Sequence, residues 1–361
     1  MKKKPTQPLQ DPFQRVLEKT YAARVPFMAH WELTYRCNLE CVHCYATKRR
    51  APGELSLPEI KKILDQLAEA NCLFLCFTGG EVFCRRDLMG ILRAARERGF
   101  ALRLLTNGTL LTEQLADELA VINPLSVEMS LYAMTPPVHD RITGVPGSHS
   151  KTVAAIRLCR ERGIRTAVKT IFLKYNLGEY RALADFARAT KSRFVFDYLL
   201  SPADDGRRPM DEHGLGEDEI YRFLVLHSGR PGARREREGA KNRALSPGPA
   251  GSEPVCGLGC NTVAVTPRGD VLPCLAVRQS VGNLRARSFK SIWTDSALDK
   301  IRDARYAALK DCMGCEYIEY CARCPGVALA ECGNILGRSY TACRAARAAM
   351  RARKELNRRG N

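Results

Sequence analysis

Cysteine spacing is the feature of this sequence that most restricts what the chain can fold into. Sixteen cysteines occur in 361 residues, and nine of them lie between residues 256 and 343. Three others follow the pattern Cys37-x3-Cys41-x2-Cys44. The first residues contain no secretory signal, the apolar run 72–77 is too short to span a bilayer, and no other run approaches that length. We therefore expect a soluble, cytoplasmic protein without membrane contact. In that compartment thiols are kept reduced, so the cysteines are expected to be metal ligands or catalytic residues.

Residues 28–200 alternate between short apolar runs and segments with helical periodicity, one of which begins with a Ser56-x2-Glu59 capping box. Helices of this length between strands imply parallel pairing with right-handed crossovers. The predicted strands are residues 28–35, 72–77, 101–106, 125–131, 165–173 and 193–200, and the predicted helices are residues 56–68, 87–99, 112–121, 151–162 and 178–190. The sequence thus predicts an α/β fold with an open sheet or partial barrel, whose sites lie at the carboxyl ends of the strands.

Residues suited to cofactor chemistry follow the first two predicted strands. The three cysteines come after the first strand, and they can occupy three corners of an iron-sulfur cube, with a fourth ligand missing locally. Gly79, Gly80 and Glu81 follow the second strand, where glycines allow a ligand to approach the backbone and a carboxylate can hold an ammonium group. A zinc site completed by His43 is the alternative, although a ligand adjacent to Cys44 would be strained.

On these motifs, residues 28–200 resemble the radical S-adenosyl-L-methionine (SAM) superfamily. The resemblance implies that Cys37, Cys41 and Cys44 ligate a [4Fe-4S] cluster whose fourth iron is open to SAM. It also implies reductive cleavage of SAM to a 5′-deoxyadenosyl radical, which abstracts hydrogen from a substrate. The residues that it assigns to SAM binding are Gly79, Gly80, Glu81, Asn107 and Ser130, although a simple Asn-Gly turn explains Asn107 equally well. His43 and Tyr45 are the two candidates for packing on the adenine ring.

The cysteine-dense segment 256–343 resembles the SPASM extension of radical SAM enzymes, which holds two auxiliary [4Fe-4S] clusters. A hairpin turn at residues 267–270 is predicted to present Cys274. The resemblance implies one auxiliary cluster on Cys256, Cys260, Cys274 and Cys324, and another on Cys312, Cys315, Cys321 and Cys343. Cys332 is the alternative to Cys324, and a zinc knuckle over residues 312–324 is the alternative to the second cluster.

Besides Cys332, four further cysteines fall outside these sets. Cys72, Cys76 and Cys159 lie on apolar faces and are expected to be small buried side chains. Cys84 lies just past Glu81 and is a candidate for a functional role near SAM.

The domain organisation follows from these segments and from composition. We expect an N-terminal extension (1–27), a partial (β/α)6 radical SAM barrel (28–200), a connecting helix with a flexible linker (201–255), a SPASM domain (256–343) and a basic C-terminal tail (344–361). The net charge of +18 would favour nucleic acid as a partner. However, much of the excess lies in the tail and in residues 229–253, and no RNA-binding module is recognisable, so a nucleic acid partner is not expected.

The substrate class follows from the resemblance alone. Residues 130–148 are most similar to the ribosomal-peptide maturases among SPASM enzymes, which implies a peptide substrate that undergoes crosslinking or other maturation. Leader recognition would come from a partner protein or the SPASM region, and electrons from a flavodoxin- or ferredoxin-type donor. Modification of a tetrapyrrole or another small molecule, RNA modification and simple electron transfer are the alternatives, whereas Leu275 argues against sulfatase maturation because those enzymes carry aspartate there.

Overall fold

The computed structural model describes residues 12–46, 53–228 and 254–359, and its centre is a nine-stranded sheet. The strand order is β6-β5-β4-β3-β2-β1-β7-β8-β9. The first six strands are parallel and lie close to the predicted ranges: β1 (Met28–Thr34), β2 (Phe74–Gly79), β3 (Ala101–Thr106), β4 (Ser126–Ser130), β5 (Thr166–Ile171) and β6 (Arg193–Asp197). The edge strands β6 and β9 do not pair within the described residues, so the sheet is an open, partial barrel as predicted.

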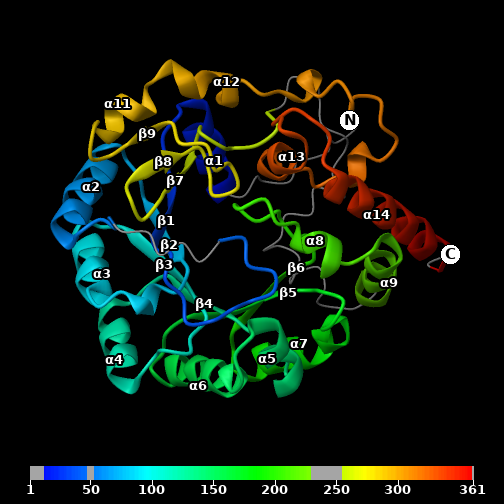
Figure 1. Cartoon of the computed structure of the whole chain (residues 1–361), viewed down its shortest axis with the longest axis horizontal. Coiled ribbons are helices and arrows are strands. Elements are labelled where there is room, and N and C mark those ends of the chain that lie inside the picture. Colours follow the sequence, from blue (N-terminus) through cyan, green and yellow to red (C-terminus); the bar gives the residue numbers. More distant parts are fainter. Residues whose placement is uncertain (1–11, 47–52, 229–253, 360–361) are drawn as a thin grey trace, which may run out of the picture.

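Helices surround the outer face of the curved sheet (Figure 1). The predicted helices between strands are α2 (Leu57–Glu69), α3 (Leu88–Glu97), α4 (Glu113–Ile122), α6 (Ser148–Glu161) and α7 (Tyr180–Ala189). The predicted capping box opens α2, because the backbone N–H and hydroxyl of Ser56 both donate to Glu59 Oε2 at 2.7 Å. Helices that the sequence analysis did not predict are α1 (Pro12–Ala22), α5 (Pro136–Thr143), α8 (Pro209–Glu212), α11 (Phe289–Trp293), α12 (Asp299–Arg302) and α13 (Pro325–Cys332).

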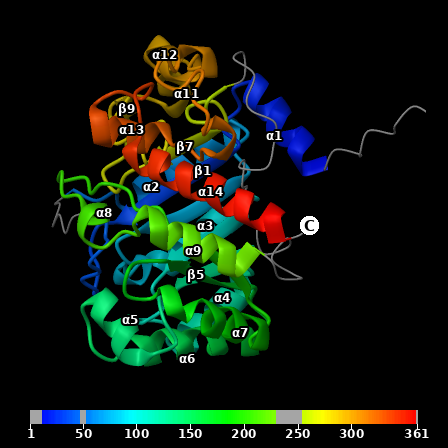
Figure 2. The same cartoon turned by 90° about the vertical axis from the view of Figure 1, so that its right-hand side faces the viewer.

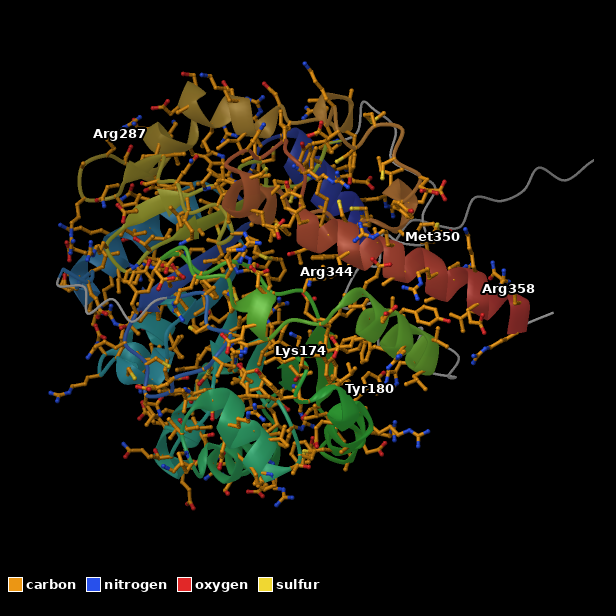
Figure 3. All side chains as sticks on the ribbon, turned by 45° about the vertical axis from the view of Figure 1, so that its right-hand side comes forward. Lys174, Tyr180, Arg287, Arg344, Met350 and Arg358 are labelled. Carbon is orange, nitrogen blue, oxygen red and sulfur yellow. The ribbon has the colours of Figure 1, made fainter. Side chains whose placement is uncertain are left out.

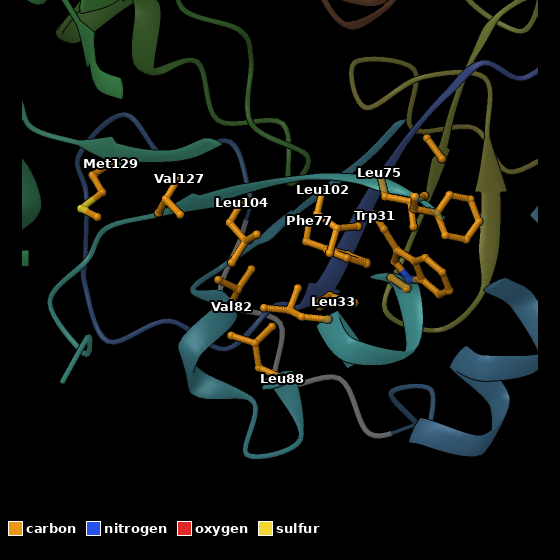
Figure 4. Packing of buried hydrophobic residues seen from close by; sticks show 14 of the residues in the cluster. Trp31, Leu33, Leu75, Phe77, Val82, Leu88, Leu102, Leu104, Val127 and Met129 are labelled. Carbon is orange, nitrogen blue, oxygen red and sulfur yellow. The ribbon is translucent and has the colours of Figure 1, made fainter. Parts of the chain in front are cut away.

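The apolar core lies between the sheet and this layer of helices (Figure 4). Alternate residues of each strand point outward, and Trp31 and Phe77 on neighbouring strands are fully buried there. Cys72 and Cys159 belong to this core, as predicted. Cys76 is also buried, but it points to the inner face of the barrel, where Glu128 and Arg103 are its charged neighbours. The expectation of an apolar face is therefore wrong for Cys76. Side chains alternate along a strand, so Cys76 lies on the other face of β2 from Leu75 and Phe77.

The C-terminal region extends the same sheet. Strand β7 (Thr262–Val265) pairs in parallel with β1, with Met28 opposite Thr262, and β8 (Asp270–Leu272) and β9 (Gly282–Asn283) follow in antiparallel order. The predicted hairpin is present between β7 and β8, and Gly269 has φ +87° in its turn. The pairing of this hairpin beside β1 was not predicted from the sequence.

The last helix, α14 (Tyr340–Arg359), contains residues 344–359 of the predicted basic tail and begins several residues before it. It lies alongside α9 (Glu217–Ser228) in Figures 1 and 2, and Figure 3 shows Arg344 and Arg358 at its two ends. Arg347 pairs with Glu217 at 2.7 Å, so part of the basic charge is neutralised within the protein. The predicted linker 229–253 lies outside the described residues. No helix in the described part of the chain is long and apolar enough to cross a membrane.

Candidate active site and cluster sites

The first three cysteines lie in the loop that follows β1. Burial raises the pKa of Cys37 to about 11 and that of Cys41 to about 12, and Cys44 is close enough to both thiols to raise their pKa values further. The backbone N–H of Leu39 donates to Cys37 Sγ at 3.4 Å. The structure therefore brings these three thiols together at the carboxyl end of β1.

Gly79 and Gly80 permit a close approach between this loop and the end of β2. A Cβ on Gly79 would lie 2.2 Å from the carbonyl oxygen of Thr34, and one on Gly80 would lie 2.3 Å from that of Arg36. Instead, the N–H of Gly80 donates to Thr34 O and that of Glu81 donates to Arg36 O, both at 2.8 Å. Because Gly79 and Gly80 lack side chains, the backbone of the cysteine loop can lie close to the end of β2. The expectation from the sequence was that a ligand would make this close approach.

Glu81 is fully buried beside the cysteine loop. Its carboxylate accepts hydrogen bonds from Thr106 Oγ1 at 2.6 Å, Asn107 N at 2.7 Å and Phe83 N at 3.1 Å. Burial raises the pKa of Glu81, and these three donors oppose the rise. Glu81 therefore ties the end of β2 to the end of β3.

The other two residues assigned to SAM lie near the same loop. Asn107 Nδ2 donates to Asn38 Oδ1 at 3.0 Å and lies 4.0 Å from Cys37 Sγ. Ser130 ends β4, and its side chain lies beside the hydroxyl of Tyr132, which also lies beside the thiol of Cys41. The carboxyl ends of β1 to β4 thus converge on the cysteine loop, as expected for parallel strands. Cys84 lies close to both Glu81 and Cys37.

The two candidate aromatic side chains point in different directions. His43 packs edge-on against Tyr132, with ring centroids 4.8 Å apart, and burial lowers the pKa of His43 to about 4. Tyr45 instead lines a cavity of about 620 Å³. Its hydroxyl donates to Glu32 Oε1 at 3.1 Å.

This cavity of about 620 Å³, called the interdomain cavity below, has walls from both halves of the chain. Thr78, Leu105 and Lys169 come from β2, β3 and β5. The remaining walls are the loop at residues 201–208, the loop at residues 275–279 and the helix α13. A substrate group held here would lie beside the residue that follows Cys44.

A buried ionic network that the sequence analysis missed lies at the edge of the interdomain cavity. Glu32 is fully buried, and its Oε2 accepts from Arg278 Nη1 at 2.9 Å and from Tyr35 OH at 3.1 Å. Arg278 Nη2 donates to the same Tyr35 hydroxyl at 2.9 Å and lies 3.8 Å from Asp204 Oδ2. One signal was available: Glu32 is a lone carboxylate within the strand Met28–Thr34, and a buried charge requires a partner.

The first auxiliary set is gathered around the β7–β8 hairpin. Burial raises the pKa of Cys274 to about 12, and the neighbouring thiols of Cys324 and Cys256 contribute to this rise. Burial also raises the pKa of Tyr21 to about 12, and the nearby thiols of Cys260 and Cys256 raise it further. Cys332 is exposed, and its thiol lies 3.7 Å from the carbonyl oxygen of Asn334.

The second auxiliary set lines a cavity of its own. Burial raises the pKa of Cys321 to about 12, and the neighbouring thiols of the set contribute. The cavity has a volume of about 480 Å³ and all four cysteines of the set in its wall, namely Cys312, Cys315, Cys321 and Cys343. We call it the C-terminal cluster cavity.

The donor sets fit iron-sulfur clusters better than single metal ions. Nowhere in residues 12–46, 53–228 and 254–359 do three His, Cys, Asp or Glu side chains converge closely enough to hold one ion. In a closed zinc site, four ligands converge on one ion with Zn–S bonds of about 2.3 Å. The thiols that ligate a [4Fe-4S] cluster bind different corners of a cube, so their sulfur atoms lie farther apart. In addition, the buried Nη1 of Arg323, in the wall of the C-terminal cluster cavity, has no hydrogen-bond partner in the described chain. A negatively charged cluster in that cavity would offer one.

Comparison with known proteins agrees with this geometry. The radical SAM superfamily model matches residues 31–187, and the model of the SPASM iron-sulfur cluster-binding domain matches residues 256–325. The chain therefore belongs to the radical SAM superfamily and carries a SPASM domain. It is an enzyme that uses a [4Fe-4S] cluster with SAM, together with auxiliary iron-sulfur clusters, as the resemblance implied.

Individual relatives differ in the activities that their names describe. The AdoMet-dependent heme synthase of Methanosarcina barkeri is 28% identical over 86% of this chain and 94% of its own length. AlbA of Bacillus subtilis, a biosynthesis protein for the antilisterial bacteriocin subtilosin, is 28% identical over 83% of this chain and 67% of its own. Streptococcus suis SuiB, solved with its precursor peptide SuiA, shares the fold with a TM-score of 0.64 at 18% identity, over 95% of this chain and 84% of that one.

Proposed function

We propose that this radical SAM/SPASM enzyme abstracts hydrogen from one residue of a ribosomally made peptide or protein held in the interdomain cavity. The observation that carries the proposal is the position of this cavity, whose wall includes Tyr45, directly after Cys44, and residues from both halves of the chain. A peptide substrate need insert only one side chain into such a space. The similarity to a bacteriocin biosynthesis protein supports the peptide class.

The proposal assigns the cluster ligands and SAM contacts as the sequence predicted them. The ligands of the SAM cluster are Cys37, Cys41 and Cys44. The ligands of one auxiliary cluster are Cys256, Cys260, Cys274 and Cys324, and those of the other are Cys312, Cys315, Cys321 and Cys343. The residues that contact SAM are Gly79, Gly80, Glu81, Asn107 and Ser130. When bound, the reduced cluster and SAM supply a 5′-deoxyadenosyl radical.

Residues of this chain would position the substrate and exclude water. Leu105, Leu275 and Val327 form apolar parts of the wall of the interdomain cavity, which protects a radical from solvent. Tyr45 is held in place there by its hydrogen bond to the buried Glu32. This hydrogen bond limits the positions that the Tyr45 ring can take beside the substrate.

A tetrapyrrole substrate is the second candidate, and the charge of the same cavity favours it. Lys169, Arg208 and Arg278 all line the interdomain cavity. Each of these cations already pairs with a carboxylate of the chain, so the carboxylates of a macrocycle would share the cations with Glu128, Asp211 and Glu32. The similarity to a heme synthase over nearly its whole length supports this class.

The proposal includes partners and a compartment. Electrons would come from a flavodoxin- or ferredoxin-type protein, and the peptide leader would be recognised by a separate protein or by the SPASM region. We place the reaction in the cytoplasm, because all sixteen cysteines lie in the described residues and none forms a disulfide.

The first test measures metal content and SAM cleavage. After anaerobic reconstitution, we expect about twelve irons per chain with matching sulfide, and about eight with loss of 5′-deoxyadenosine formation in the variant Cys37→Ala/Cys41→Ala/Cys44→Ala. Cys324→Ala should lose about four irons, and the matched control Cys332→Ala none. About four irons with stoichiometric zinc would exclude two auxiliary clusters.

The second test decides the substrate class. Under dithionite, the enzyme is incubated with SAM and either peptides encoded beside its gene or iron-coproporphyrin III. A mass change in a peptide, with equimolar 5′-deoxyadenosine, is the expected result. Conversion of the porphyrin without any change in the peptides would replace the proposed substrate by the second candidate.

A further inference from the structure

Two arginines in the wall of the C-terminal cluster cavity have no role in the function proposed so far. Arg323 lies between two of the assigned ligands, Cys321 and Cys324. Its Nε donates to the carbonyl oxygen of Gly337 at 3.1 Å, and its Nη2 donates to those of Gly337 and Ile335. Its Nη1 is buried without a hydrogen-bond partner in the described chain. Arg323 is therefore a fixed cation with one unused donor beside the thiols.

Arg338 also approaches a thiol of this set. Its Nε donates to Cys343 Sγ at 3.5 Å, and its guanidinium is exposed to solvent. No ion pair joins Arg338 or Arg323 to a carboxylate in the described residues. The hydrogen bond to sulfur is thus the polar contact that orients Arg338.

The other charged residues of this cavity include two carboxylates and one further arginine. Asp311 and Glu316 line the cavity, and so does Arg347. Arg347 pairs with Glu217 of α9 at 2.7 Å. The two carboxylates therefore equal Arg323 and Arg338 in number, but the Arg323 charge acts on the Cys312 thiol more strongly than the Asp311 charge does.

A positive environment has a specific effect on an iron-sulfur cluster. A [4Fe-4S] cluster with four thiolates is an anion, and one-electron reduction adds a further negative charge. Hydrogen bonds to sulfur and nearby cations stabilise the reduced form more than the oxidised form, which raises the reduction potential.

We propose that Arg323 and Arg338 raise the reduction potential of the cluster held by Cys312, Cys315, Cys321 and Cys343, so that this cluster accepts an electron more readily. The inference rests on the ligand set assigned under the proposed function. Arg323 and Arg338 are not catalytic residues, because they do not touch the substrate. They act by changing the electrostatic environment of the cluster and thereby its reduction potential.

The experiment is a redox titration, followed by electron paramagnetic resonance, of the reconstituted full-length enzyme and its variants. The signal of this cluster is the one that disappears in Cys343→Ala. Arg338→Gln should lower its midpoint potential, and Arg338→Lys should lower it less, because lysine keeps the charge but loses the planar fork. The matched control is Arg351→Gln, which removes the same charge from α14 at a residue paired with Asp218 at 2.8 Å, and it should leave the potential unchanged.

Two results would overturn the inference. One is an Arg338→Gln potential equal to that of the wild type and of Arg351→Gln, with full iron content. The other concerns salt: because Arg338 is exposed, salt should screen its charge, so the difference in potential between the wild type and Arg338→Gln should shrink as salt rises, and a difference independent of salt would contradict a charge effect. If Cys343→Ala loses no iron, the ligand set itself is wrong, which is a different failure.

Discussion

The buried side chain of Glu81 has two candidate roles, contact with a ligand and hydrogen bonding within the chain. The sequence analysis assigned it an ammonium ligand, and the structure shows a carboxylate that already accepts three hydrogen bonds from Phe83, Thr106 and Asn107. Carboxylate oxygens have further lone pairs, so a ligand contact remains compatible with this arrangement. However, the three bonds alone explain why glutamate is needed at this position.

The variant Glu81→Gln tests how much the hydrogen bonds of this carboxylate contribute to stability. The amide replaces one acceptor oxygen by a donor, so at least one buried N–H or O–H loses its partner, and we expect a loss of about 1–3 kcal/mol in the free energy of unfolding. Urea unfolding measures this loss, and calorimetry should show weaker binding of SAM. The matched control is Glu97→Gln, at an exposed residue of α3. Equal stability of the two variants would refute the structural role.

Residues that act through local spacing could be predicted, and residues that act through distant contacts could not. The three cysteines after β1 lie within eight residues of one another, so their pattern alone indicates that their thiols come together. By contrast, Arg278 reaches Glu32 only because β7 places the C-terminal region beside β1. Sequence periodicity contains no information about such a pair.

At the scale of elements, the strands of the barrel were predictable because each is a short apolar run between helical patterns. Short helices such as α5 and α13 were missed, because each has only 8 residues and too few turns to show periodicity. The placement of β7 was missed for another reason. A hairpin motif predicts its own turn but not the strand edge against which it pairs.

The contact between the ends of β1 and β2 provides an element-scale prediction. In Gly80→Ala, the new Cβ would lie 2.3 Å from the carbonyl oxygen of Arg36, so the cysteine loop must move away from β2. We expect the reconstituted variant to lose about four irons and SAM cleavage while its circular dichroism spectrum is retained.

The control for this variant is Gly178→Ala, because a Cβ at Gly178 would meet no atom within 4 Å apart from its own chain neighbours. It should keep its full iron content. If Gly80→Ala also keeps all its iron, the close approach does not position the cluster ligands.

At the scale of the whole molecule, the ion pair between Glu32 and Arg278 joins the barrel to the SPASM region. Arg278→Met would leave the fully buried Glu32 without its cation, and loss of one partner of a buried pair costs about 3–5 kcal/mol. The double variant Glu32→Gln/Arg278→Met should recover much of this loss. Denaturant unfolding of the four proteins in this cycle measures the coupling.

Arg287→Met serves as the matched control for this cycle. Arg287 pairs with Asp295 at 2.8 Å, but its side chain is 41% exposed, so its removal should cost less than about 1 kcal/mol. A similar small cost for Arg278→Met would show that the network does not hold the two regions together.

The pairing of β1 with β7 also has a consequence for synthesis of the protein. Met28 pairs with Thr262, so most of the chain must leave the ribosome before β1 acquires its second neighbour. Until then, β1 is an edge strand with unpaired backbone groups, which promotes aggregation. We therefore expect nascent chains that stop before β7 to depend on chaperones, and cells that translate this protein slowly to require more of that help.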